Sequence, residues 1–300
     1  MKTHTLGLLT TFITISTLLN AQDYAFKVLA NKGNNEVKSA GTWQPLKTGA
    51  SLKKGDEVKL ADNSYLGLVH NSGRPLEVKQ AGVYPVAALE SKVDGGTTSV
   101  LNKYTDFILS SNSAEAQKNR LNATGAVHRD ITTGAPIKLA LPDNQHAGIL
   151  NNTAIINWDG SKVAGPYVIT VKNMFEDVLD QEETPETSYR IDLGTQKYTG
   201  ESAILIEVSS KADPKQVSKQ HLIKKLSPAE QQALSASLKE LVGEVNEETP
   251  LNKLILAGFY EKNNLLIDAI FAYEQAIELA PDVPTFQESY EEFLLRNKLK

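Results

Sequence analysis

The stretch TPLNKLILAGFYEKNNLLIDAIFAYEQAIELAP, residues 249–281, holds the clearest fold signal in the 300-residue chain. Thr249 followed by Pro250 is typical of a helix start, because Thr caps free backbone N–H groups and Pro fits the first helical turn. Small and aromatic residues then recur at helical spacing, at Leu256, Ala257, Tyr260, Ala269, Tyr273, Ala276 and Pro281. Small residues let two antiparallel helices approach closely, and aromatic residues fill the space between them. The pattern predicts a helical hairpin.

That spacing resembles a tetratricopeptide repeat, with Lys253 standing where the repeat usually has its early Trp. A Ser-x-x-Glu capping box predicts another helix over 228–242, and a last helix is predicted over 286–298. A repeat array needs about three units to stand alone, so we expect these helices to cap one another or to pack on the rest of the chain. Residues 226–300 are therefore predicted to form a tetratricopeptide-like helical region.

At the other end of the chain, residues 1–21 have the layout of a secretory signal peptide. A basic start at Lys2 is followed by an apolar stretch from Leu6 to Leu19 and a small residue, Ala21, at the expected cut. The stretch is short for a membrane span and is diluted by Thr and Ser; an uncleaved anchor or a buried first strand is the alternative. We expect a periplasmic or secreted protein with no transmembrane segment after signal removal.

Composition narrows the classes of function. The chain has 31 Lys+Arg and 36 Asp+Glu, a net charge of −5, which argues against nucleic acid as a partner because such binders need a basic footprint. It has no Cys, which excludes disulfides, thiolate zinc sites and cysteine nucleophiles. The acidic excess is concentrated in residues 226–300, with 13 Asp+Glu and 6 Lys+Arg, as expected for the solvated face of helices.

Between the signal peptide and the C-terminal helices, the sequence predicts two β regions joined by a helix and linker. Short alternating runs broken by turn residues predict a small β-domain over 22–90, with its core supplied by Trp43, Leu46, Leu52 and Val58. Helical spacing over 97–110 predicts one amphipathic helix, within a helix-and-linker region over 91–135. Five candidate strands follow within 136–210, at Ile137–Leu141, Ala154–Trp158, Tyr167–Val171, Tyr189–Leu193 and Ala203–Val208.

Those five strands carry β-branched residues on both faces and place Trp158 on an early strand, which fits a fibronectin- or immunoglobulin-like β-sandwich. The fold class predicted for the whole chain is therefore mixed and multidomain, β + α. It joins a small β-domain, a fibronectin/immunoglobulin-like β-sandwich and a C-terminal α-helical tetratricopeptide-like segment.

The first β-domain resembles the periplasmic domain of FecR-type (iron-dicitrate) sensors. The residues that carry the resemblance are Trp43-Gln44-Pro45-Leu46, Gly49-Ala50-Ser51-Leu52, Gly55-Asp56-Glu57-Val58, Ser64, Gly73 and Gly82-Val83-Tyr84. Two later segments, Lys103-Tyr104-Thr105-Asp106-Phe107-Ile108-Leu109 and Gly125-Ala126-Val127-His128-Arg129, resemble exported envelope proteins of gliding and gut bacteria that join such a domain to helical repeats. The resemblance implies a periplasmic β-domain joined to helices.

Motifs with catalytic or metal-binding chemistry are weak. Ser51 and Lys54 form a Ser-x-x-Lys next to a Lys-Thr-Gly, but both elements share one predicted turn, whereas penicillin-binding enzymes hold them on separate elements. Carboxylates crowd residues 176–186, a pattern that serves glycoside hydrolysis or Ca²⁺ binding only when rigidly placed. A solvated hairpin is the preferred interpretation there. The sequence thus predicts no catalytic residue, no metal site and no cofactor.

The function predicted from these features is that of an exported, non-enzymatic binding or scaffold protein of the bacterial cell envelope. Its partner is expected to be a protein or a cell-envelope glycan, with Asn263, Asn264 and Gln287 as candidate contact residues on the helices. Trp43 and Trp158 are expected to fill β-domain cores, where large aromatic residues contribute most burial. The alternatives are a periplasmic regulatory sensor of FecR type and, third, a hydrolase using the carboxylates of residues 176–186.

Overall fold

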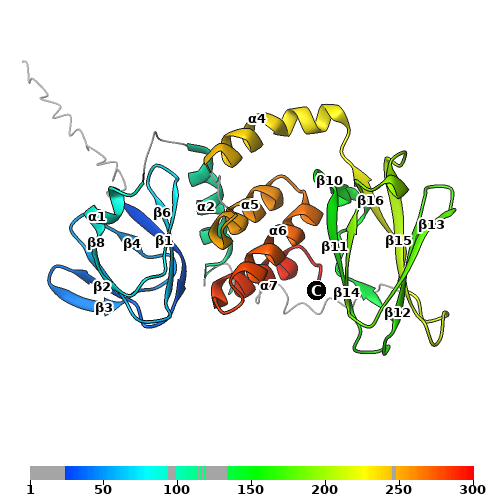
Figure 1. Cartoon of the computed structure of the whole chain (residues 1–300), viewed down its shortest axis with the longest axis horizontal. Helices are drawn as coiled ribbons and strands as arrows, with labels where there is room; N and C mark the ends of the chain where they lie inside the picture. Colours follow the sequence, from blue (N-terminus) through cyan, green and yellow to red (C-terminus); the bar gives the residue numbers. More distant parts are fainter. Residues whose placement is uncertain (1–23, 94–98, 114, 116–117, 119–133, 245–247) are drawn as a thin grey trace, which may run out of the picture.

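The protein places two β units on either side of a group of helices (Figure 1). Its structure, a computed structural model, describes residues 24–93, 99–113, 115, 118, 134–244 and 248–300. The predicted signal peptide over 1–21 and most of the predicted linker up to residue 133 lie outside the described residues. Below, the N-terminal β unit is 24–93 and the central β unit is 134–225; α2 and α4–α7 form the helical unit.

The N-terminal β unit consists of two four-stranded antiparallel sheets, with strand orders β4-β1-β6-β7 and β3-β2-β5-β8. Its elements are β1 (Phe26–Lys32), β2 (Glu36–Ser39), β3 (Thr42–Pro45), β4 (Ser51–Leu52), β5 (Glu57–Leu60), β6 (Tyr65–His70), β7 (Pro75–Val78), β8 (Gly82–Pro85) and α1 (Val86–Glu90). Gly33 turns the chain after β1 with a φ of +95°, and an added Cβ would lie 2.4 Å from Ser64 Oγ. Glycine is therefore needed there.

Strands β1 and β6 are buried on both faces because each serves two cores. Alternate side chains such as Phe26 and Leu68 point into the core of the N-terminal β unit. Leu29 of β1 and Tyr65 of β6 belong instead to the core of the helical unit. Period-two alternation places successive side chains on opposite sheet faces, so one sheet joins the two units.

The expected core of the N-terminal β unit is confirmed for Leu46, Leu52 and Val58, but Trp43 is a correction. Trp43 is half-buried on the outer face of β3, away from that core. The Nζ atoms of Lys38 and Lys59 lie 5.7 Å and 5.8 Å from the centre of a Trp43 ring. Cation–π contacts of this kind cover an indole without placing it in a core.

The central β unit also has two sheets, with strand orders β10-β16-β15-β12-β13 and β14-β11-β9. Its strands are β9 (Lys138–Leu139), β10 (Gly148–Ile149), β11 (Thr153–Asp159), β12 (Tyr167–Lys172), β13 (Val178–Thr184), β14 (Ser188–Asp192), β15 (Ala203–Ser210) and β16 (His221–Lys225). The pairing is antiparallel except between β10 and β16. Inward side chains of both sheets share one core, and Trp158 is buried in it as predicted.

The helical unit contains α2 (Ser99–Ser111), α4 (Pro228–Glu244), α5 (Pro250–Lys262), α6 (Leu266–Leu279) and α7 (Pro284–Arg296). The helix starts predicted at residues 228 and 250 are confirmed. Glu230 Oε2 accepts a hydrogen bond of 2.7 Å from the Ser227 N–H, and Thr249 Oγ1 accepts one of 3.3 Å from the Asn252 N–H. Among the described helices, none combines the length and the apolar character needed to cross a bilayer.

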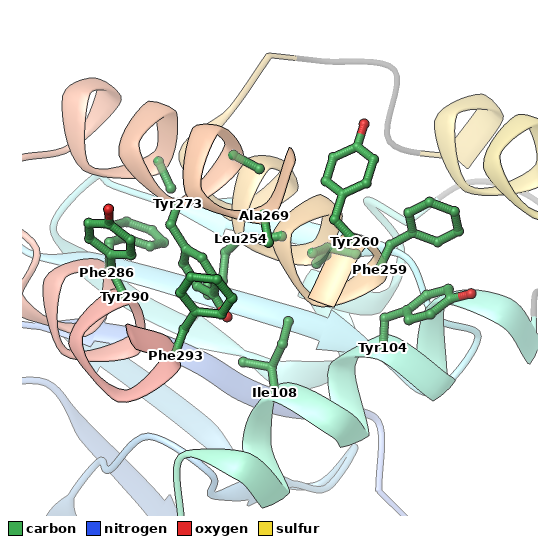
Figure 2. Close-up of a cluster of buried hydrophobic side chains, with 14 of the residues drawn as sticks. Tyr104, Ile108, Leu254, Phe259, Tyr260, Ala269, Tyr273, Phe286, Tyr290 and Phe293 are labelled. Atoms are coloured by element: carbon green, nitrogen blue, oxygen red, sulfur yellow. The ribbon is translucent and has the colours of Figure 1, made fainter. Parts of the chain in front are cut away.

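Helices α2, α5, α6 and α7 share one aromatic core (Figure 2). Tyr273 stacks with Tyr290 at a ring-centroid distance of 5.7 Å, and Tyr104 meets Phe259 edge-on at 5.2 Å. Gly258 allows α2 to approach α5, because a Cβ there would lie 2.8 Å from the side chain of Ile108. The core continues into the N-terminal β unit, where Tyr65 meets Phe286 edge-on.

Candidate functional site

A cleft of about 650 Å³ opens where the central β unit meets the helical unit. In the central β unit its walls come from the chain leading into β9, from β9 itself, from the segment between β9 and β10, from the end of β11 and the loop after it, and from the start of β16 and the residues before it. In the helical unit they come from the turn between α5 and α6, the start of α6 and the end of α7. The volume lies in the range of about 300–1,000 Å³ typical of small-ligand sites. We call this site the interunit cleft.

The first turn of α6 fixes one wall of the interunit cleft. Leu266 lines the cleft, and the next residue, Ile267, is fully buried in the core of the central β unit. A helix that contributes a core side chain to a neighbouring β unit cannot shift against it without opening a void. This wall is therefore part of a fixed junction between the two units.

Asp268, the next residue of α6, locks the same junction by hydrogen bonds. Its carboxylate accepts bonds from the Leu150 N–H at 2.8 Å, the Asn151 N–H at 2.9 Å and Asn151 Nδ2 at 2.8 Å. Asn151 Nδ2 also donates to Tyr260 Oη at 3.0 Å. Burial raises the pKa of Asp268 to about 6, although these hydrogen bonds act in the opposite direction.

The end of α7 forms another wall and is held by a second buried group, the Glu261 cluster. Arg296 Nε and Nη2 donate to the two Glu261 carboxylate oxygens at 2.6 Å and 2.8 Å. Asn297 Nδ2 and the Tyr273 hydroxyl donate to the same carboxylate at 2.9 Å and 3.2 Å. Bidentate pairing of this kind fixes geometry as well as charge, so Arg296 serves the wall of the cleft and is already neutralised.

Apolar side chains line part of the interunit cleft. Its buried floor is formed by Ile137, Leu139, Leu141, Leu266 and Leu299. His221 also lines it, against the backbone of Pro142, and burial lowers the pKa of its imidazole. A neutral imidazole at pH 7 is compatible with this apolar environment.

The rim of the interunit cleft is cationic. Lys138, Lys162, Lys219 and Lys298 line it, and all four are exposed. None of the four forms an ion pair with any residue in the described ranges. They stand out in a chain whose net charge is −5.

Two carboxylates share this rim, and both are engaged locally. Asp143 Oδ1 lies 3.0 Å from His146 Nδ1 and accepts a hydrogen bond of 3.2 Å from the Gln145 N–H. Asp159 Oδ1 accepts a hydrogen bond of 2.8 Å from the Ser161 N–H. Hydrogen bonds from His146 and from Ser161, respectively, hold the pKa of each carboxyl below its usual value, so both stay ionised. The four lysines outnumber them, and the rim keeps a positive excess.

The three sequence-predicted contact residues do not share one site. Asn264 is exposed and lines the interunit cleft. Its neighbour Asn263 ends α5 by donating from Nδ2 to the Phe259 carbonyl at 2.8 Å. Gln287 lies on the exposed side of α7, where its side chain donates to Glu291 Oε1 at 3.2 Å, outside the cleft.

The carboxylates of residues 176–186 lie along β13 and in the turns before and after it, and neighbours bind several of them. Asp180 accepts hydrogen bonds from Lys197 Nζ at 2.8 Å and Tyr198 Oη at 2.9 Å. Although burial opposes ionisation, these bonds lower the pKa of Asp180. Asp177 is bound by Asn173 Nδ2 at 3.0 Å. Within the described ranges, no three His, Asp or Glu side chains converge in a way that could hold a metal ion.

Comparison with known proteins does not assign a function to the interunit cleft. No family model matches the chain, and the search of curated proteins gives no significant match.

Proposed function

We propose that the chain is an exported binding or scaffold protein of the bacterial cell envelope that recognises a protein or glycan partner. In this proposal the N-terminal β unit is a FecR-like domain, the central β unit is a fibronectin-like β-sandwich, and α5–α7 form a tetratricopeptide-like segment. Export rests on the signal-peptide pattern of residues 1–21.

The finer architecture is supported by the packing within each unit. In the central β unit the inward residues of two sheets share one core, the arrangement expected of a β-sandwich. In α5 and α6 the small positions Ala257, Ala269 and Ala276 are buried, together with the repeat aromatics Tyr260 and Tyr273. Their burial agrees with the roles that a tetratricopeptide repeat gives to these positions.

The observation that carries the functional proposal is how the best-organised polar groups are used. Asp268 and the Glu261 cluster are buried and satisfied by hydrogen bonds that fix one segment to another. On the other side, Glu77 Oε1 accepts a hydrogen bond of 3.0 Å from the Leu251 N–H, joining β7 to α5. The best-ordered polar groups of the chain therefore hold its segments in a fixed arrangement, and the interunit cleft lies beside them. A fixed structure with a preformed cleft is suited to recognising a partner.

The proposal is tested by immobilising the purified chain and passing over it separate protein and glycan fractions of the cell envelope. We expect saturable retention of a defined protein or glycan, measured against blocked resin. Retention of a membrane receptor or an anti-sigma protein alone would instead favour the regulatory sensor of FecR type.

The same experiment addresses the hydrolase alternative. Progressive release of soluble glycan fragments during incubation, abolished by replacing Glu176, Asp177 and Asp180 with Ala, would replace the binding proposal by an enzymatic one. Retention of neither fraction would overturn the proposal.

A further inference from the structure

We propose that the interunit cleft binds amphipathic anions, molecules that join an apolar body to a carboxylate or phosphate head group. The inference rests on the binding function proposed above and names the ligand chemistry of one site. The site is built from described residues that are distant in sequence, as the lysines at positions 138, 162, 219 and 298 illustrate.

The floor selects for an apolar body. Ile137, Leu139 and Leu299 are each at most 5% exposed in the structure, so their side chains are held by packing rather than by a ligand. An apolar group that enters the cleft leaves water and meets a preformed apolar surface, which contributes roughly 25 cal/mol for each Å² buried. A compact inorganic ion gains nothing from this floor.

The rim selects for negative charge. None of the four exposed lysines forms an ion pair within the described ranges, although Lys138 and Lys162 lie close enough to Asp159 for their charges to help lower the pKa of its carboxyl. Two engaged carboxylates, Asp143 and Asp159, reduce this excess without cancelling it, and Arg296 is matched by Glu261. An anionic head group at the rim is therefore attracted, while a cationic head group of the same size is repelled.

Because the chain has no Cys, a single introduced Cys can be labelled specifically and can report on the cleft. Gly134 lines the cleft, and a Cβ added there meets no atom within 4 Å. Gly200, which precedes β15 and does not line the cleft, is open to the same extent. Gly134→Cys and Gly200→Cys, each labelled with an environment-sensitive fluorophore, form a matched pair of reporters.

The probes share one decyl tail and differ in the head group: decanoate, decyl phosphate, decanol and decyltrimethylammonium, with acetate as an anion lacking the tail. We expect a saturable fluorescence change at position 134 with decanoate or decyl phosphate, and none at position 200. Decanol and acetate should bind at least tenfold more weakly, and decyltrimethylammonium should not bind. A preference between decanoate and decyl phosphate identifies the head group.

A charge-reversal pair tests the rim. Lys138→Glu combined with Lys219→Glu, in the Gly134→Cys background, should weaken decanoate or decyl phosphate binding at least tenfold. Lys47→Glu combined with Lys239→Glu changes the net charge equally at exposed positions outside the cleft and should leave binding unchanged.

Equal binding of the neutral, cationic and anionic probes, or no response at position 134, would overturn the cleft assignment. Envelope retention is measured separately, so it can persist when the probes fail, and the reverse outcome is equally visible.

Discussion

Replacing Glu261 by Ala should be among the most damaging single changes in the helical unit. The Glu261 side chain is 5% exposed and that of Arg296 is 17% exposed, so both charges are largely removed from water. Loss of the carboxylate leaves the guanidinium with Asn112 Oδ1 at 3.0 Å and removes the acceptor of the Tyr273 hydroxyl. Breaking a buried pair by removing one partner costs about 3–5 kcal/mol, which is the loss of unfolding free energy expected here.

The measurement is urea unfolding followed by far-ultraviolet circular dichroism, which reports the helices. Glu183→Ala is the matched control: Glu183 pairs with Lys211, and their side chains are 54% and 51% exposed. An exposed pair of this kind contributes at most about 1 kcal/mol. Combining Glu261→Ala with Arg296→Ala should cost less than the sum of the two single changes, because the second removes the stranded charge. A loss for Glu261→Ala no larger than that for Glu183→Ala would refute the reasoning.

Three further predictions concern single positions. The pKa of Asp268 is raised from 3.8 to about 6, so its contribution to stability is fully present below pH 4 and is lost as the pH rises through 6. The unfolding free energy of the wild type, compared with Asp268→Asn, should therefore fall by roughly 2 kcal/mol between pH 4 and 7; parallel profiles would contradict this. Gly258→Ala should destabilise through its 2.8 Å clash with Ile108, and Ile108→Ala should relieve that clash in a double variant; additive losses would count against the clash. Phe175→Ser, at a side chain that is 86% exposed, should leave the melting temperature unchanged, and a clear drop would show that Phe175 packs against something.

Local signals predicted the local structure well. Ser227 with Glu230, and Thr249 with Pro250, mark helix starts because their chemistry acts within one turn of the chain. Strand β13 is not among the predicted strands, because its run of acidic residues favours a solvated hairpin. Among the described strands it pairs with β12 alone and so lies at the edge of its sheet, where exposed charges are tolerated.

Long-range features left no comparable trace in the sequence. Asp268 sits in an apolar helix, and its main partners are backbone N–H groups more than 100 positions earlier in the chain, which any residue type could supply. The position of Trp43 could not be predicted, because a strand of four residues does not show which of its faces is covered by lysines of the neighbouring strands β2 and β5. The interunit cleft could not be predicted either, because its lining residues lie far apart in the sequence. Among the three predicted contact residues, only Asn264 lines it.

The single isoleucine at position 267 has a consequence for the ancestry of the chain. Because it completes the interior of the central β unit from a helix that begins 41 positions after that unit ends, the helices and the β unit must have been inherited together or refitted on joining. Fusion of two independently folded domains would leave the core of the β unit without this one side chain. A homologue that carries this β unit without the helices should show a bulkier residue filling that space.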